Sequence, residues 1–277
     1  MILSKKIWRF VVVGFLMSGV MIWNLWLGLG DGKMHVMFLD VGQGDSIFIE
    51  SPEGHQVLVD GGPGNFVIEE LNEVMPFFDK SIDMIVLTHP HADHVDGLVE
   101  VLKRYEVDLV LATGVKGGDS GGAEFWKEVK NLGVEVEIAR AGRDFVAGSV
   151  VMDILYPTEE LAGKEVDNLN NSSIAMVVEY EDVRVLLTGD LEEEAEAELL
   201  KAGVDLKADI YKAGHHGSKT ASTLEFLEKV QPEIVVIQCG KDNKFDHPHP
   251  EALRNFHRVG VDKIHRNDID GRVEFEF

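Results

Sequence analysis

The sequence feature that most constrains the fold is a repeated alternation of short, β-branched apolar runs with longer amphipathic stretches. The apolar runs have the length and composition of strands, and they cover 35–41, 46–50, 56–60, 83–88, 107–112, 134–139, 150–156, 173–180, 183–190, 208–213 and 233–239. Amphipathic patterns typical of helices cover 64–78, 93–104, 122–132, 191–202, 219–230 and 249–260. Several runs are apolar throughout, which indicates strands covered on both faces. The order predicts an α/β sandwich of two mixed sheets with helices outside.

A long-range similarity within the chain suggests two related halves. Residues 56–62 and 183–190 both form an apolar run that ends in Asp and Gly. Each is followed by a second apolar run that leads into histidines, at 83–91 and 208–216. The similarity fits either two halves that face each other or a coincidence between common strand endings, and the sequence leaves both open.

The N-terminus has the pattern of a membrane segment. Residues 10–30 contain no charged residue, and Lys5, Lys6 and Arg9 precede them. About 20 apolar residues span a bilayer as a helix, and flanking cations stay on the cytoplasmic side. We therefore expect residues 1–30 to form an uncleaved signal anchor and residues 31–277 to form one extracytoplasmic domain. A cleaved signal peptide followed by secretion is the alternative.

Charge and cysteine content limit the possible ligands. The chain has 26 Lys+Arg against 49 Asp+Glu, a net charge of −23, which argues against a broad basic surface for nucleic acid. An anionic ligand must therefore be attracted locally, by a metal or by a few placed cations. Cys239 is the single cysteine, so a disulfide framework and a thiolate zinc cluster are both excluded.

The strongest chemical signal is a cluster of metal-ligand residues after the run at 83–88. Three imidazoles and a carboxylate occur within six residues, namely His89, His91, Asp93 and His94. Imidazole and carboxylate ligands suit zinc, iron or manganese. Asp190 ends another apolar run, and a carboxylate at such a position can bridge two ions. We expect all five residues to be metal ligands.

Two further segments add polar groups at strand-to-helix turns. His215, His216 and Ser218, with nearby amides of a helix N-terminus, are suited to receive an anionic oxygen. In the second segment, at 246–250, His247 is the better candidate for a ligand and His249 for an exposed residue. The cations around these segments fit either a local positive strip or a solvated helix face: Lys212, Lys219, Lys241, Lys244, Arg254 and Arg258.

Together these motifs resemble the metallo-β-lactamase superfamily, and within it the hydrolase domain of ComEC-type DNA-uptake proteins, which also occurs as free-standing hydrolases and in phosphorylcholine esterases. The resemblance covers roughly 33–277. It is carried by FLDVGQGD at 38–45, HPHADH at 89–94, VLLTGD at 185–190, KAGHHGS at 212–218 and NKFDHPHPE at 243–251. It implies an αβ/βα sandwich with two divalent ions, zinc or manganese, between the sheets.

The resemblance also implies roles for single residues. Asp93, His215 and His216 correspond to catalytic positions, and Asn171, Ser172, Ser218 and Lys219 to positions near the substrate. The superfamily usually carries a further histidine ligand about twenty residues before the bridging aspartate, whereas this chain has Asn and Ser at 170–173. Whether His215, His216 or His247 completes the second metal site is left open by the sequence.

The function that the resemblance implies is hydrolysis of a phosphodiester, possibly in DNA, by a membrane-anchored two-metal enzyme. A phosphorylcholine-esterase-like activity, a lactam or thioester hydrolase and a catalytically weak binding module are the alternatives. The sequence predicts no protein partner.

Overall fold

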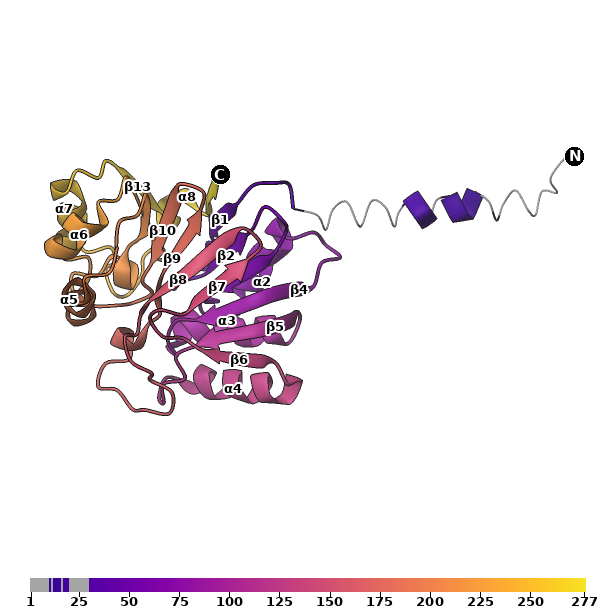
Figure 1. The fold of residues 1–277 in the computed structure, drawn as a ribbon, viewed down its shortest axis with the longest axis horizontal. Helices are drawn as coiled ribbons and strands as arrows, with labels where there is room; N and C mark the ends of the chain where they lie inside the picture. Colours follow the sequence, from indigo (N-terminus) through magenta and orange to yellow (C-terminus); the bar gives the residue numbers. More distant parts are fainter. Residues whose placement is uncertain (1–9, 11, 16, 20–29) are drawn as a thin grey trace, which may run out of the picture.

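The computed structural model describes residues 10, 12–15, 17–19 and 30–277. Two seven-stranded sheets pack face to face, and helices cover their outer faces (Figure 1). This is the predicted α/β sandwich of two mixed sheets. The predicted membrane segment at 10–30 lies mostly outside the described residues. Among the residues that the structure describes, no helix is long and apolar enough to span a bilayer.

The first sheet has the strand order β14-β1-β2-β3-β4-β5-β6. Its strands are β1 (His35–Phe38), β2 (Ile47–Glu50), β3 (Gln56–Val59), β4 (Ser81–Leu87), β5 (Glu106–Ala112), β6 (Glu135–Ile138) and β14 (Val273–Glu276). The strands from β3 to β6 are parallel, and those before β3 pair antiparallel. Helices α2 (Phe66–Val74), α3 (Ala92–Leu102) and α4 (Ser120–Leu132) connect the parallel strands.

The second sheet repeats this plan, with the order β13-β12-β11-β10-β9-β8-β7. Its strands are β7 (Asp144–Ala147), β8 (Val150–Tyr156), β9 (Ala175–Tyr180), β10 (Val183–Leu187), β11 (Ile210–Lys212), β12 (Ile234–Ile237) and β13 (Lys263–Arg266). Strands β10 to β13 are parallel and β8 to β10 antiparallel. Helices α5 (Glu193–Ala202), α6 (Leu224–Val230) and α7 (Pro250–Arg258) connect the parallel strands, and α8 (Asn267–Asp270) follows β13. The two halves suggested by the internal similarity are therefore real.

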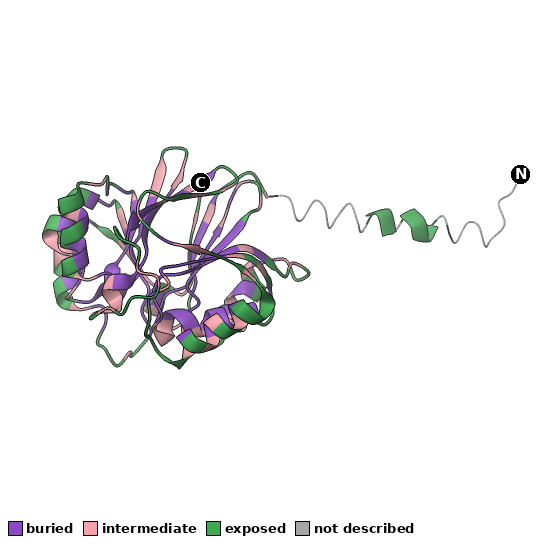
Figure 2. Ribbon diagram, turned by 60° about the horizontal axis from the view of Figure 1, so that its bottom comes forward, coloured by how far each residue is buried: buried purple, intermediate pink, exposed green. Residues whose placement is uncertain are grey.

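The core lies in three layers that follow from the alternation of side chains along each strand. One layer fills the space between the sheets and includes Val36, Phe38 and Val185. The other two lie between each sheet and its helices, with Met37 and Leu98 in one and Tyr211 and Phe226 in the other. Figure 2 shows this as buried strands between helices whose outer faces are exposed. Burial on both faces explains why most strands read as continuous apolar runs.

Candidate metal centre

The carboxyl ends of the parallel strands from both sheets meet at one end of the sandwich, where α/β folds usually place their ligands. His89 and His91 follow β4, and Asp93 and His94 lie in the first turn of α3. Asp190 follows β10, and His216 lies in the short helix η2 (Gly214–Gly217) after β11. Both halves of the fold therefore contribute to the site.

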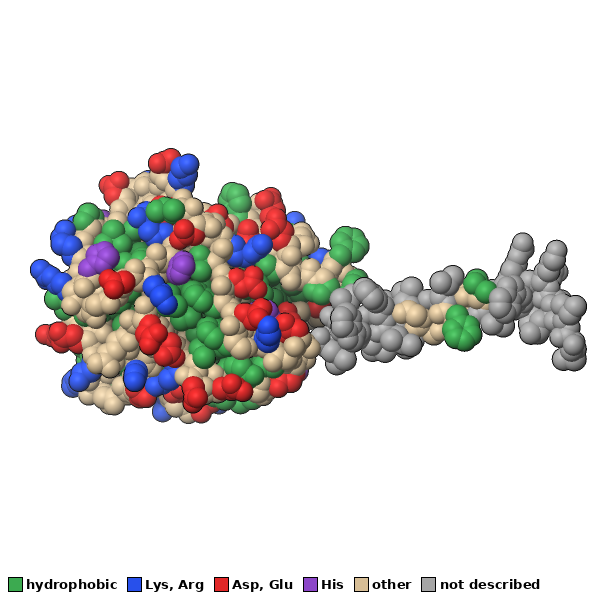
Figure 3. Space-filling view, turned by 90° about the horizontal axis from the view of Figure 1, so that it is seen from above, with side chains coloured by type: hydrophobic (Ala, Val, Ile, Leu, Met, Phe, Trp, Pro, Cys, Tyr) green, Lys and Arg blue, Asp and Glu red, His purple; other side chains and the backbone are tan. Residues whose placement is uncertain are grey.

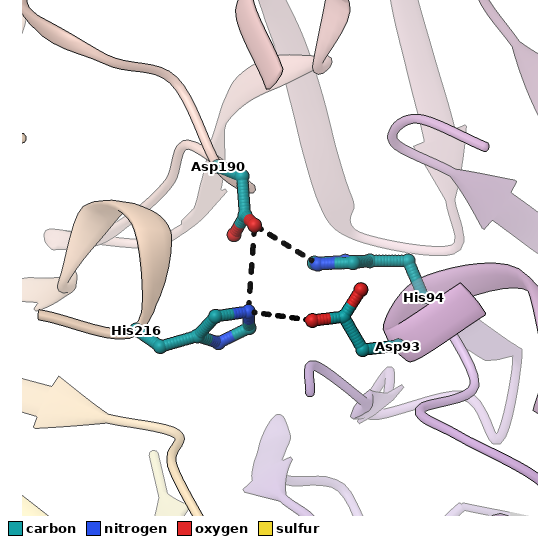
Figure 4. Close-up of side chains that lie close together, drawn as sticks. All are labelled: Asp93, His94, Asp190 and His216. Carbon is teal, nitrogen blue, oxygen red and sulfur yellow. Dashed lines mark ion pairs between the residues drawn. The ribbon is translucent and has the colours of Figure 1, made fainter. Parts of the chain in front are cut away.

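Four side chains meet at the centre of this site: Asp93, His94, Asp190 and His216 (Figure 4). One ligand atom from each lies within 4.8 Å of the others. Asp190 Oδ2 is 3.3 Å from His94 Nε2 and 3.4 Å from His216 Nε2. His216 Nε2 is also 3.4 Å from Asp93 Oδ2. We call these four residues the DHDH cluster.

Both imidazoles of the DHDH cluster are oriented by hydrogen bonds on their outer nitrogen. His94 Nδ1 donates to Asp60 Oδ2 at 2.8 Å, and His216 Nδ1 donates to the Gln238 carbonyl oxygen at 3.0 Å. Each ring therefore turns its Nε2 into the cluster, which is the arrangement that fixes the tautomer of a metal-binding histidine. Asp60 in turn accepts from the Thr88 hydroxyl at 2.6 Å, so the orientation of His94 is itself supported.

The backbone around His216 adopts a rare conformation. His215 and His216 have φ values of 47° and 54°, in the left-handed region that residues other than glycine seldom enter. The Ser218 amide donates to the His215 carbonyl at 2.8 Å, and the His215 amide donates to the Gly189 carbonyl at 3.2 Å. These bonds hold two strained residues in place beside Asp190. Strain of this kind concentrates at functional sites.

A second possible ion position lies beside the first but has fewer ligands. His89 Nε2 and His91 Nδ1 are 3.0 Å apart, and His89 Nε2 is 3.9 Å from Asp190 Oδ2. The segment expected to supply a further ligand instead places Ser173 Oγ 3.2 Å from His89 Nδ1, on the outer side of the ring. Within the described part of the chain, this position has two imidazoles and the shared Asp190, against four ligand residues at the DHDH cluster.

The charges and unpaired atoms of the site fit divalent cations. His94 Nε2, His216 Nε2 and Asp190 Oδ1 are buried without a hydrogen-bond partner among the described residues. Four carboxylates, those of Asp45, Asp60, Asp93 and Asp190, meet one buried ammonium, that of Lys212, so negative charge is in excess even when the rings of His94 and His216 are both protonated. Buried charge of one sign requires compensation, and imidazole and carboxylate suit zinc, manganese or iron.

Proton and metal binding compete at the DHDH cluster. Burial would lower the pKa of both His94 and His216, but Asp190 outweighs it, together with Asp60 for His94 and Asp45 for His216. The pKa of each ring is therefore raised well above its ordinary value. The same two imidazoles outweigh the effect of burial on Asp190 and hold its pKa well below the usual range. A cation that binds to the rings must displace their protons.

We therefore predict that metal affinity falls as the pH is lowered from 8 to 6, with release of up to two protons per ion at the cluster. Calorimetric titration of the metal-stripped protein with Mn²⁺, in two buffers of different ionisation enthalpy, measures the proton release. His257, which is exposed, gives the control variant His257→Gln, which should behave as the wild type. Binding enthalpies that do not depend on the buffer would contradict this prediction.

The sequence did not identify three buried residues that support the site. Lys212 is fully buried, forms an ion pair with Asp45, and donates to the Gly189 carbonyl at 3.1 Å. It therefore does not belong to a positive surface strip. Asp45 also lies 3.1 Å from His216 Nδ1, and Asp60 orients His94. Two features of the sequence could have identified the aspartates. Asp45 ends the motif at 38–45, and Asp60 ends the apolar run at 56–60.

Gly44, in the motif at 38–45, is required by a close backbone contact. A side chain at Gly44 would place its Cβ 2.2 Å from the carbonyl oxygen of Asp93, and Gly44 has a φ of 147°. The amide of Asp45 donates to the same carbonyl at 3.2 Å. Only glycine permits this approach, which brings Asp45 beside the first turn of α3.

His215 lies at the rim of the site rather than inside the DHDH cluster. Its Nε2 is 3.9 Å from Asp190 Oδ2, and its Nδ1 is 3.1 Å from Glu192 Oε1. Glu192 also accepts from the Thr220 hydroxyl at 2.8 Å. The side chain of His215 is 23% exposed, whereas that of His216 is buried. His215 can therefore meet a ligand from solvent while Glu192 holds its ring.

Several expected site residues have other contacts. His247 is not part of the DHDH cluster: its ring centroid is 6.1 Å from that of His216, and burial, followed by the nearby imidazoles, lowers its pKa to about 3. His216, and not His247, therefore lies in the DHDH cluster, while the ligand role of His247 stays a prediction. His249, expected to be exposed, is half-buried and accepts from the Lys219 amide.

Of the four residues expected near the substrate, three make contacts within the fold and one is exposed. Both ends of the Asn171 amide are used, because it accepts from the Glu192 amide and donates to Glu194. Ser172 is buried and donates to the Leu169 carbonyl, and Ser218 pairs with Thr220. These three side chains serve the fold in this structure. Lys219 is exposed and stays available to a ligand.

A four-layer αββα sandwich with a His/Asp cluster at the carboxyl ends of its parallel strands defines a class of metal-dependent hydrolases. The sequence profile of the Metallo-beta-lactamase superfamily matches residues 39–241. This chain therefore belongs to the metallo-β-lactamase superfamily.

Curated relatives place the chain near competence proteins. It is 30% identical to ComE operon protein 3 of Bacillus subtilis over 87% of this chain, and 30% identical to competence protein ComA of Neisseria gonorrhoeae over 88%. The chain spans about a third of the length of these relatives, 33% and 32% respectively. It is a metallo-β-lactamase-fold hydrolase related to them, with a His/Asp cluster consistent with divalent metal binding.

Solved structures confirm the fold. YhfI of Bacillus subtilis, a metallo-β-lactamase fold protein, aligns with a TM-score of 0.58 at 12% identity, over 88% of this chain and 100% of its own. CmlA of Streptomyces venezuelae, a diiron β-hydroxylase, aligns with a TM-score of 0.56 at 16% identity, over 88% and 54%. At these identities the likeness concerns the fold alone.

Proposed function

We propose that this chain hydrolyses phosphodiesters with two divalent ions, zinc or manganese, held at the DHDH cluster and at His89 and His91. When bound, such ions lower the pKa of a water molecule and neutralise charge on the phosphate oxygens. The protein residues fix the geometry: Asp60 and Gln238 orient the two imidazoles, and Asp190 lies between the two positions.

The observation that carries this proposal is the position of His215. A partly exposed imidazole lies 3.9 Å from the aspartate shared by the two ion positions, and Glu192 holds its second nitrogen. An alkoxide that leaves a phosphodiester needs a proton, and a positioned imidazole is a suitable general acid. We assign His215 to protonate the leaving oxygen, with Glu192 as the positioning residue.

The charges beside the site limit how a substrate is bound. A groove between α5, α6 and α7 contains three cations and four acids: Lys219, Arg254, Arg258, Glu193, Glu194, Glu225 and Glu251. Acidic and basic side chains are also interspersed on the face shown in Figure 3. This supports recognition of one phosphate at the metals rather than binding along an extended backbone. The end of a DNA strand meets that requirement, as does a small ester.

We also propose that residues 10–30 anchor the chain in a membrane and that the hydrolase domain lies outside the cytoplasm. The support is the uncharged segment and the preceding cations.

An activity screen tests the proposed reaction. The purified full-length chain, loaded with Mn²⁺ or Zn²⁺, is assayed on bis(p-nitrophenyl) phosphate, single-stranded DNA, glycerophosphocholine and a β-lactam. We expect hydrolysis of the phosphodiesters, with loss of activity after chelation and recovery when the metal is restored. Hydrolysis of the lactam alone would contradict the proposal, and a chain that binds metal but hydrolyses none of the four would support the binding module.

We predict that Glu192→Gln lowers kcat about 10- to 100-fold for an ester with an alkyl leaving group, and much less for p-nitrophenyl esters. Glutamine cannot stabilise a protonated His215, and p-nitrophenolate leaves without a proton. Steady-state rates on a thymidine dinucleotide and on bis(p-nitrophenyl) phosphate make this comparison. Glu228→Gln, at an exposed position on α6, is the matched control. An equal loss on both substrates would assign Glu192 a purely structural role.

A further inference from the structure

The N-terminal part of the chain is fixed to the domain at a defined point. The Gly32 amide donates to the Pro52 carbonyl at 3.2 Å, and a Cβ at Gly30 would lie 2.1 Å from the same oxygen. Pro52 lies in the turn between β2 and β3. The uncharged segment 10–30 therefore ends two residues before the chain is bonded to this turn. Where so few residues intervene, the turn must stay close to the end of that segment.

The Pro52 turn and the metal centre lie at opposite ends of the sandwich. Strand β3 begins just after this turn, at Gln56, and ends at Val59, directly before Asp60. Strand β4 runs parallel to β3 and leads to His89. Figure 1 shows the chain joining the domain beside β1 and β2. The strand directions therefore place residues 30–32 and the metal centre at opposite ends of the domain.

Two exposed phenylalanines lie at the same end as the Pro52 turn. Phe77 is 90% exposed and Phe78 is 50% exposed, in the loop 76–80 between α2 and β4. Gln56 Nε2 donates to Asp79 Oδ2 at 2.8 Å, which joins this loop to the beginning of β3. Adjacent phenyl rings are rarely left in water at this level, and such a patch indicates an interaction surface.

The loop 76–80 has the chemistry of a membrane contact. The Asp79 carboxylate is occupied by hydrogen bonds from Gln56 and Ser81, whereas the Lys80 ammonium lies at the surface, 4.9 Å from the Tyr105 ring centre. The loop thus presents two phenyl rings together with one carboxylate and one cation, and the Lys80 ammonium also donates to Asn72 Oδ1 at 3.2 Å. Aromatic and basic side chains are suited to the interface of a bilayer with anionic lipids.

We propose that Phe77 and Phe78 enter the interface of the bilayer that holds residues 10–30, so that the metal centre faces away from the membrane. This inference rests on the proposed anchor and not on the proposed reaction. Strand β4 has 7 residues, about 23 Å at 3.3 Å per residue, and it separates the loop from the centre. Substrate then reaches it from the aqueous side and not from the lipid surface.

Lipid quenching in the full-length chain tests the orientation. Phe77→Cys and Ile269→Cys are each labelled with an environment-sensitive fluorophore and reconstituted into vesicles of phosphatidylethanolamine and phosphatidylglycerol that contain brominated lipid. Ile269 is the matched control, because it is 69% exposed and lies at the opposite end, on α8, where Asn267 binds the Phe38 carbonyl at the end of β1. The native Cys239 is fully buried, and wild-type protein treated with the same fluorophore shows how much label this cysteine takes up.

We expect bromine to quench the label at position 77 severalfold more strongly than the label at position 269. Equal quenching of the two labels, or an unquenched label at position 77, would overturn the proposed orientation. Failure of the chain to float with the vesicles would also overturn it, because the anchor would then be absent. None of these readouts depends on hydrolysis, so the proposed phosphodiesterase activity stands or falls separately.

Discussion

Replacing Asp190 by alanine is expected to lower phosphodiesterase activity on the order of 10³-fold. Among the residues that the structure describes, Asp190 is the one carboxylate within 3.9 Å of imidazoles from both ion positions, since its Oδ2 lies 3.9 Å from His89 Nε2 and 3.3 Å from His94 Nε2. Its loss removes a carboxylate from both positions. It also leaves the imidazoles of His94 and His216, whose pKa values are raised, without their shared counterion. Steady-state rates and bound metal per chain, measured on the same sample, test this expectation.

The matched control for Asp190→Ala is Asp108→Ala, which removes an exposed carboxylate from β5 and should keep full activity and full metal content. Circular dichroism of both variants checks that the fold is retained. A folded Asp190→Ala protein that kept full activity and bound metal would refute the assignment of Asp190 to the metal centre.

Lys212→Met is expected to produce the largest loss of stability, about 3–5 kcal/mol. The Lys212 ammonium is fully buried, pairs with Asp45 and donates to the carbonyl of Gly189, which directly precedes Asp190. Methionine fills a similar volume but leaves the Asp45 carboxylate buried without its cation. The pKa of Asp45 is held below its ordinary value against the effect of burial, first by Lys212 and then by His216.

Guanidinium unfolding of metal-stripped protein measures this loss. The double variant Asp45→Asn/Lys212→Met removes both charges and should recover more than half of it, because neither charge is then left unpaired. Lys219→Met, at an exposed position, controls for the loss of a lysine. A Lys212→Met protein with the stability of the wild type would show that the buried pair does not stabilise the domain.

Most of the fold was predictable because burial on both faces leaves a clear pattern in the sequence. All eleven predicted runs are strands, and the six predicted helices match α2 to α7 within a few residues. The missed strands are β7, β13 and β14, three of the four edge strands of the two sheets. Sequences such as KIHR and VEFE are short, contain charged residues and have at most one buried position, so no apolar run marks them.

The candidate site was predictable only in part. His89, His91, Asp93, His94 and Asp190 were found because ligand-type residues follow apolar runs at close spacing. That His216 rather than His247 lies in the cluster depended on the left-handed turn at His215 and His216. This turn places the ring of His215 at the rim of the site and the ring of His216 inside the cluster. Backbone reversal of that kind has no signature in the sequence of the motif.

The sequence by itself determined the layered α/β architecture, the repeat of one plan in two halves and the kind of ligand atoms at the metal centre, because periodic burial and residue chemistry are local properties. The tertiary structure alone decided that Lys212 is an internal counterion rather than a surface cation, that Glu192 holds His215, and that Asp45 and Asp60 support the imidazoles. These roles come from contacts between residues far apart in the chain, and such contacts exist only after both sheets have packed.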